Sequence, residues 1–281
     1  MKLHSLFIAI AVIFVFTTQN ANAQNTALSA LNRGDAAYEA GNYDLAIREY
    51  TEAIRLSPNM VSAYANRAIV YMIKGDWTRV ITDLEAAINR IDQNNAEERA
   101  ISINIIRILE EELKPMQAAF NRGLTAYNAE NYDLAITEFT RVLEIMPSEG
   151  TFLNRGLAYG KKGDYEHAFA DWTSVLAINP NNAEALRLYN SAIPVVAEIS
   201  FNRAIVALQE NNLILAITEL DNAIKINQNY EDAFFARGVI AHSIRSYDHA
   251  IADFEAVLRI NPNNEEARKR LGQARLSKAL N

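Results

Sequence analysis

An arginine followed sixteen residues later by a carboxylate recurs six times along this chain. The six pairs are Arg33/Glu49, Arg67/Asp83, Arg122/Glu138, Arg155/Asp171, Arg203/Glu219 and Arg237/Asp253. An arginine and an acid form a hydrogen-bonded ion pair, and loss of one partner from a buried pair leaves an uncompensated charge. Because the pair occurs in every unit, we interpret it as a structural bridge within a repeat and not as a catalytic group.

Other residues that carry chemistry do not form a catalytic or metal-binding pattern in this sequence. There is no cysteine, and the mature chain has three histidines, His167, His242 and His249. His167 and His249 occupy the same repeat position in different units, which does not favour a metal site. The sequence lacks G-x-S-x-G, H-E-x-x-H and a phosphate-binding glycine-rich loop. We therefore expect no enzymatic activity, no catalytic residue, no metal and no cofactor.

The arginine pairs lie in a repeating unit of 34 residues that is predicted to form two short helices joined by a turn. Gly41, Gly75 and Gly163 stand at the turn, where a residue in the left-handed conformation ends a helix at least cost. The units are expected at about 27–60, 61–94, 116–149, 149–182, 197–230 and 231–264. They come in three pairs.

Three further segments, 95–115, 183–196 and 265–281, follow the three pairs and begin with similar Asn and Glu residues. Asn accepts a hydrogen bond from a free backbone N–H, and Glu is favoured near the positive end of the helix dipole, so each segment is predicted to be an additional helix. Pro115 and Pro194 are expected to interrupt the helical pattern before the next pair begins.

The repeated frame is clearest from Asn154 to Tyr165, with Ala168, Trp172 and Pro180 at fixed offsets. It resembles the tetratricopeptide repeat, in the subtype whose first helix carries Asn-Arg-Gly or Asn-Arg-Ala, and the resemblance covers residues 27–264. It implies an all-α fold, a right-handed α-solenoid of six hairpins in three pairs with additional inter-pair and C-terminal helices. Members of the family are similar in binding peptides or protein surfaces on a concave face lined by first helices.

Residues 1–23 have the pattern of a secretory signal peptide. Lys2 gives a positive start, residues 6–16 are apolar, and Ala21-Asn22-Ala23 is a small-x-small cleavage pattern. The apolar run is shorter than the roughly 20 residues of a membrane-spanning helix. We expect cleavage after Ala23, a mature chain of 24–281 that is periplasmic or secreted, and no membrane insertion after cleavage.

The charge of the chain argues against polyanionic partners. The formal net charge is -7, and loss of Lys2 with the signal peptide gives -7 - 1 = -8. Lys and Arg are spread through the repeats and not clustered, which disfavours nucleic acid and anionic lipid as ligands. We expect a protein or peptide partner.

The first-helix positions that face the concave surface in this family are mostly apolar in this chain, although they are usually polar in the Asn-Arg-Gly subtype. The predicted partner-binding residues are Leu31, Tyr38, Asn66, Ile69, Met72, Phe120, Leu124, Tyr127, Leu153, Leu157, Phe201, Ile205, Phe235 and Val239. Asn66 is included because some family members use an asparagine at this position to bind a peptide carboxylate.

A continuous apolar strip has to be covered, because burying one such side chain contributes roughly 1.5–3 kcal/mol. An apolar helix or peptide of a partner, a second copy in a homodimer, or the chain's own additional helices would each cover it. Segment 95–115 is a candidate filler because Ile101, Ile105, Ile108 and Leu109 form one stripe. We favour the first option, which predicts an exported non-catalytic adaptor or scaffold. The alternatives are an accessory subunit that presents a substrate to an envelope enzyme and a self-assembling scaffold.

Overall fold

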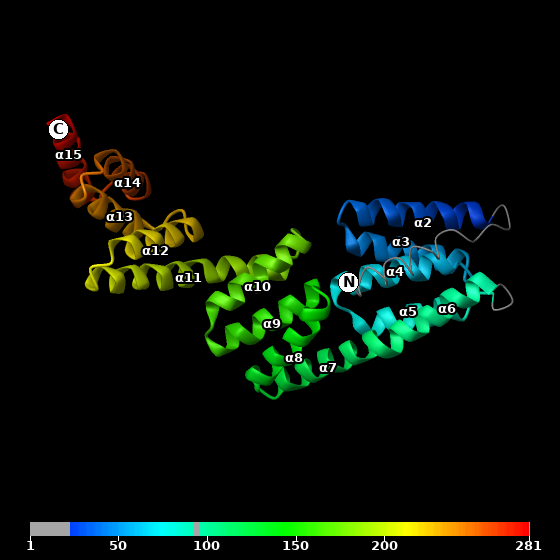
Figure 1. The fold of residues 1–281 in the computed structure, drawn as a ribbon. Coiled ribbons are helices and arrows are strands. Elements are labelled where there is room, and N and C mark those ends of the chain that lie inside the picture. The colour runs from blue at the N-terminus through cyan, green and yellow to red at the C-terminus, as the bar shows by residue number, and fades with distance from the viewer. Residues whose placement is uncertain (1–22, 93–95, 281) are drawn as a thin grey trace. The chain divides into compact units, whose positions relative to one another are not determined.

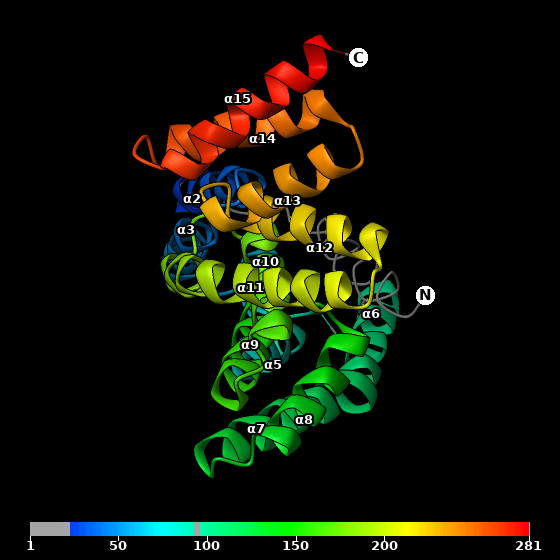
Figure 2. The ribbon, with the colours of Figure 1, turned by 90° about the vertical axis from the view of Figure 1, so that its left-hand side faces the viewer.

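The computed structural model describes residues 23–92 and 96–280, so the predicted signal peptide at 1–23 lies almost entirely outside the described residues. All regular elements in the described part of the chain are helices, which confirms the predicted all-α fold (Figure 1). Within each hairpin the two helices lie side by side (Figure 2).

The helices pair in chain order as antiparallel hairpins. Hairpins 1 and 2 are α2 (Ala23–Glu39) with α3 (Tyr43–Leu56) and α4 (Val61–Lys74) with α5 (Trp77–Ile88). Hairpins 3 and 4 are α7 (Lys114–Asn128) with α8 (Tyr132–Ile145) and α9 (Glu149–Lys162) with α10 (Tyr165–Ile178). Hairpins 5 and 6 are the second half of α11 (Ala183–Gln209) with α12 (Leu213–Ile226) and α13 (Glu231–Ser243) with α14 (Tyr247–Ile260).

The additional helices are α6 (Ala96–Ile108), the π-helical turn η1 (Leu109–Leu113), the first part of α11, and α15 (Glu265–Ala279). The chain divides into two compact units, residues 1–186 and 187–281. Hairpins 1 to 4 lie in the first unit and hairpins 5 and 6 in the second.

Local sequence explains where the helices within a hairpin end and begin. Gly41, Gly75 and Gly163 have positive φ at the turn, and in the other three hairpins Glu130, Asn211 and Arg245 adopt the same conformation. The next residue begins the second helix. In hairpins 1 to 5 this residue is Asn or Asp, and its side chain accepts a hydrogen bond from a backbone N–H three residues further on.

The prediction that Pro115 and Pro194 interrupt the helices is wrong. The segments α6, η1 and α7 follow one another without a break, and Pro194 lies inside α11. At η1 the Lys114 N–H donates to the carbonyl of Leu109, five residues back, and this wider turn accommodates a proline that has no N–H to donate. Both prolines are exposed, so water can satisfy the carbonyl groups that they leave unbonded. The inter-pair helices therefore continue into the first helix of the following hairpin.

In the first unit, one apolar cluster joins hairpin 2 to the additional helix and to hairpin 3. It contains Met72, Trp77 and Leu84 of hairpin 2 together with Ile105 of α6 and Val142 of α8. A backbone contact also links hairpin 2 to hairpin 4, because a Cβ added to Gly150 would lie 2.3 Å from the carbonyl oxygen of Lys74. Hairpin 2 is thus held by elements that lie well beyond it in the sequence.

Candidate partner-binding site

The Arg/carboxylate pairs form the predicted bridges between the two helices of a hairpin. Arg155 donates from Nε to Oδ2 of Asp171 at 2.9 Å and from Nη2 to Oδ1 at 2.7 Å. Arg67 and Arg237 bind Asp83 and Asp253 with the same two-oxygen geometry. In hairpins 1 and 3, Arg33 and Arg122 contact a single oxygen of their glutamate. The structural interpretation is confirmed for these five pairs.

In hairpins 2, 4 and 6 the arginine also binds the hairpin that precedes it. Nη1 of Arg67 donates to Thr51 Oγ1 at 2.8 Å, and Nη1 of Arg155 donates to Thr140 Oγ1 at 3.0 Å. In hairpin 6 the Nη1 of Arg237 donates to Asp221. Arg33 of hairpin 1 instead donates from Nη1 to Ser29 on its own helix. The arginine therefore lies on the surface that faces the preceding hairpin, which we call the stacking face.

The stacking faces alternate between exposed and covered along the chain. The side chains of Arg33 and Arg122 are 54% and 55% exposed, whereas those of Arg67, Arg155 and Arg237 are 15%, 18% and 27% exposed. The residue three positions after each arginine follows the same rule. Ala36, Thr125 and Val206 are exposed, whereas Val70, Ala158 and Ile240 are buried. The first hairpin of each pair has an open stacking face, and the second has a covered one.

This alternation was not predicted, although the sequence carries a signal for it. The acid is Glu in the three first hairpins and Asp in the three second hairpins. The shorter Asp is found where both carboxylate oxygens bind the arginine. These two bonds use Nε and Nη2 and fix the guanidinium, and Nη1 then donates to the preceding hairpin. Asp therefore occurs in the hairpins whose stacking face is covered, and Glu occurs in those whose stacking face is open.

The predicted concave residues lie at the edge of the core and not on a fully exposed strip. Eleven of the fourteen are half-buried, and none is exposed. The rings of Phe120 and Phe235 pack on the second helix of their own hairpin. The ring centroids are 5.6 Å apart for Phe120 and Phe139 and 5.8 Å apart for Phe235 and Phe254. Leu31 and Met72 are buried, so these two side chains belong to the core and leave no surface for a partner.

Asn66 is also a structural residue in this fold. Its Nδ2 donates to Asp35 Oδ1 at 3.0 Å, and the same oxygen accepts a hydrogen bond from the Tyr50 hydroxyl at 2.8 Å. Burial raises the pKa of Tyr50, and the hydrogen bond to Asp35 raises it further. The Asn66 amide donates to Asp35 in a partly buried network between hairpins 1 and 2, which does not favour the role of binding a peptide carboxylate.

The chain's own additional helices cover part of the concave strip. Ile105, Ile108 and Leu109 are buried in the cluster that contains Met72, and Ile69 and Phe120 pack against that cluster. In the second unit, α15 contributes Leu271 and Ala274 to the cluster against which Phe235 and Val239 pack. Intramolecular filling therefore accounts for much of the burial of these positions.

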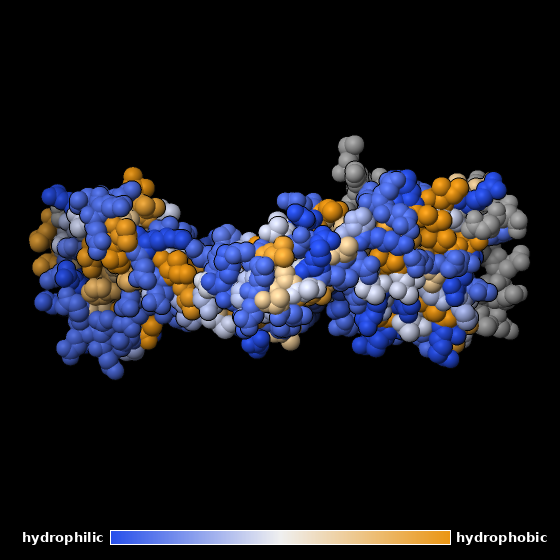
Figure 3. All heavy atoms as spheres, turned by 90° about the horizontal axis from the view of Figure 1, so that it is seen from below, coloured by the Kyte–Doolittle hydropathy of each residue, from blue (hydrophilic) through white to orange (hydrophobic). Residues whose placement is uncertain are grey.

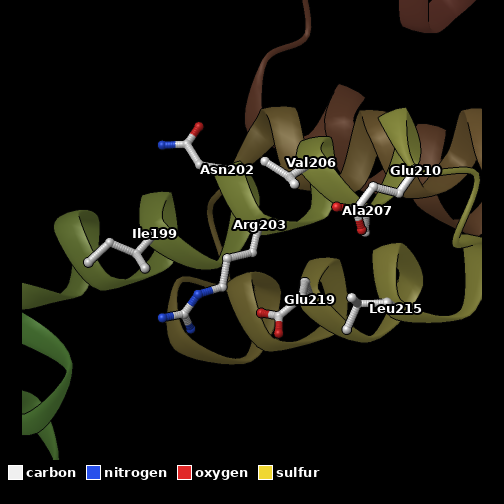
Figure 4. A pocket seen from close by; sticks show the side chains of 8 residues that line it. All are labelled: Ile199, Asn202, Arg203, Val206, Ala207, Glu210, Leu215 and Glu219. Atoms are coloured by element: carbon white, nitrogen blue, oxygen red, sulfur yellow. The ribbon is translucent and has the colours of Figure 1, made fainter.

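A shallow pocket of about 450 Å³ lies on the open stacking face of hairpin 5 (Figure 4). Val206 and Arg203 on the second half of α11 and Leu215 and Glu219 on α12 line it (Figure 4). Val206 and Leu215 are exposed apolar residues. The space-filling view shows other apolar residues among the polar ones on the surface of each unit (Figure 3).

The histidines have local partners in the structure. The ring of His167 stacks on Tyr159 at 4.9 Å and its Nδ1 lies 2.8 Å from both carboxylate oxygens of Asp164. His249 Nδ1 lies 2.9 Å from Ser246 Oγ. Within residues 23–92 and 96–280, no three acidic or histidine side chains are grouped so that they could hold a metal ion.

Helix α11 is long and apolar enough to cross a membrane by length and composition. Its second half is nevertheless part of a packed hairpin, since Ala204 and Ala207 are buried in one cluster with Ala216 and Leu220 of α12. We interpret α11 as a helix of the solenoid.

Three stretches of the chain match models of known repeats. Residues 34–75 match a model described as TPR repeat, and residues 150–182 and 201–265 match models described as tetratricopeptide repeat. Among solved structures, the TPR domain of P58(IPK) is 14% identical, with a TM-score of 0.35 over 90% of this chain and 98% of that one. The first TPR of Spaghetti (RPAP3) bound to an HSP90 peptide is 23% identical, with a TM-score of 0.29 over 47% and 95%.

Curated relatives are similar to parts of the chain that differ in length. The Hsp70-Hsp90 organizing protein of Triticum aestivum is 25% identical over 258 residues, which is 85% of this chain and 42% of that protein. The E3 ubiquitin-protein ligase CHIP of Arabidopsis thaliana is 40% identical over 58 residues, 21% of each chain. The chain thus spans less than half the length of these relatives. Residues 34–75, 150–182 and 201–265 are accordingly tetratricopeptide repeats, and the chain is a repeat protein of helical hairpins.

Proposed function

We propose that this protein is an exported, non-catalytic adaptor that binds an apolar peptide or helix of a partner protein on the first-helix face of its repeats. The observation that carries the proposal is a row of half-buried apolar side chains on hairpins 3 and 4, formed by Phe120, Leu124, Leu153 and Leu157. Each retains exposed apolar area that a partner would remove from water, at about 25 cal/mol per Å². Rows of anchors at helical spacing suit helix-in-groove recognition.

Two further observations support the proposal. The relatives that match most of the chain are named as organizing proteins for the chaperones Hsp70 and Hsp90, which suits an adaptor class. The signal-peptide pattern at residues 1–23 favours export, and export would place the partner in the cell envelope or outside the cell.

Photo-cross-linking in the source cells tests the binding face. We expect a photoreactive amino acid at Leu157 to give an adduct heavier than the chain, and the same group at exposed Glu144 on α8 to give none. An adduct of twice the chain's mass would assign the face to a second copy. No adduct at Leu157, or equal adducts at both positions, would refute partner binding on this face.

N-terminal sequencing of the protein from cell fractions tests export. The proposal predicts a mature chain that begins at Gln24 in the envelope or the medium. A chain that retains Met1 in the cytosol would refute export while leaving the binding face untouched.

A further inference from the structure

The open stacking face of hairpin 5 has the features of an unfilled helix-binding site. Val206 is exposed here, whereas the equivalent residues of hairpins 2, 4 and 6 are buried. Leu215 is the second exposed apolar residue of the pocket, and Arg203, Glu210 and Glu219 surround the two with charge. The same structural surface is thus covered on hairpins 2, 4 and 6 and open on hairpins 1, 3 and 5, and on hairpin 5 two exposed apolar side chains line it.

The three covered faces show what this surface accepts. Each is covered by the second helix of the preceding hairpin, and α3, α8 and α12 are the covering helices. Each covering helix carries the same pattern of three residues, which we call the triplet. An apolar residue comes first, a Thr or Asp follows four positions later, and a second apolar residue follows three positions after that. The triplets are Ile47, Thr51 and Ile54; Ile136, Thr140 and Leu143; and Ile217, Asp221 and Ile224.

The contacts give each part of the triplet a role. Ile47 and Ile54 of α3 pack against the apolar cluster of hairpin 2, and Thr51 lies between them and accepts the hydrogen bond of Arg67. In hairpin 6, Arg237 binds its own Asp253 and also Asp221 of the covering helix. An arginine that is already bonded to its own acid therefore still takes a second acceptor from the covering helix.

We propose that the stacking face of hairpin 5 binds an amphipathic helix of a partner protein that carries this triplet. The apolar residues of the helix would cover Val206 and Leu215, and its Thr or Asp would accept a hydrogen bond from Arg203. This site lies on the stacking face and is independent of the concave residues, so it would give the protein a second, separate binding surface.

A peptide with the sequence of α8, Tyr132–Ile145, is a direct probe, because α8 covers the equivalent face of hairpin 4. The chain has no cysteine, so Glu210→Cys carries an environment-sensitive dye only at the pocket. We expect a saturable change in dye fluorescence when the peptide is added to the mature chain. Ile136→Asp in the peptide should weaken binding at least tenfold, which corresponds to about 1.4 kcal/mol.

Two variants of the labelled protein provide the matched comparison. Val206→Glu should weaken binding at least tenfold, whereas Ile214→Glu should leave it unchanged, because Ile214 is exposed and adjacent to Leu215 in sequence but does not line the pocket. Both substitutions are at exposed positions, and equal melting temperatures would show that the fold is intact.

The proposal is overturned if the dye does not respond to the peptide, or if Ile214→Glu weakens binding as much as Val206→Glu. It is also overturned if light scattering finds a dimer that Val206→Glu converts to a monomer, because a second copy would then occupy the face. A monomer in which the dye at position 210 is already shielded would show that the chain itself fills the pocket, and this too would overturn it.

Discussion

The first and second hairpins of each pair have the same internal chemistry but different surroundings. Arg33 and Arg155 both bind an acid on their own second helix, yet only Arg155 also binds the preceding hairpin. Within the first unit, α6 and η1 run into the first helix of hairpin 3, and Arg122 of that hairpin is 55% exposed, whereas Arg67 and Arg155 of the second hairpins are 15% and 18% exposed. In a repeat protein, a contact that recurs in every unit therefore contributes a different stabilisation in each unit, because the contribution depends on what packs against that unit.

The largest expected difference is between alanine substitutions of the two kinds of arginine. Arg155→Ala leaves Asp171 buried without its partner and should lower the free energy of unfolding by about 3–5 kcal/mol. Arg33→Ala breaks an exposed ion pair and should cost less than about 1 kcal/mol. Urea unfolding followed by circular dichroism measures both changes. Equal losses of unfolding free energy would mean that a covered stacking face does not make the arginine pair more stabilising.

The backbone contact between hairpins 2 and 4 offers a second comparison. Gly150→Ala would place a Cβ 2.3 Å from the Lys74 carbonyl oxygen, and should destabilise the first unit by about 1–3 kcal/mol. Gly272→Ala on α15 meets no atom within 4 Å and should instead stabilise by roughly 0.5–1 kcal/mol, since alanine is the better helix former. Thermal melting compares the two, and a neutral Gly150→Ala would argue against this contact.

Exchanging the acids should produce the smallest effects. Asp171→Glu adds a methylene to a buried pair and should cost about 1 kcal/mol. Glu49→Asp acts on a pair whose arginine is exposed and should change stability by less than about 0.5 kcal/mol. If the shift in urea midpoint were the same for both, the Glu and Asp alternation would not report on covering.

The hairpins could be predicted from sequence because their determinants are local. Turn residues, helix caps and the arginine bridges lie within one unit, and the structure has them where the repeat frame puts them. Whether Pro115 and Pro194 end a helix depends instead on the local widening at η1 and on solvent exposure, neither of which the residue type specifies.

The candidate site was harder to predict because burial depends on distant helices. Met72 is a first-helix residue of the predicted strip, but it is buried in a cluster with Ile105 of α6 and Val142 of α8. Asn66 is occupied by Asp35 of another hairpin. Val206 is exposed on the second unit, and the alternation of Glu and Asp was the available signal for this open face.

Cysteine labelling tests the alternation of the stacking faces most directly. Single cysteines replace the residue three positions after each arginine in the mature chain, which has none of its own. We predict that positions 36, 125 and 206 react with a thiol reagent at least about tenfold faster than positions 70, 158 and 240, whose labelling requires local opening. Equal rates at all six positions, or protection at position 206 equal to that at position 158, would contradict the open and covered faces.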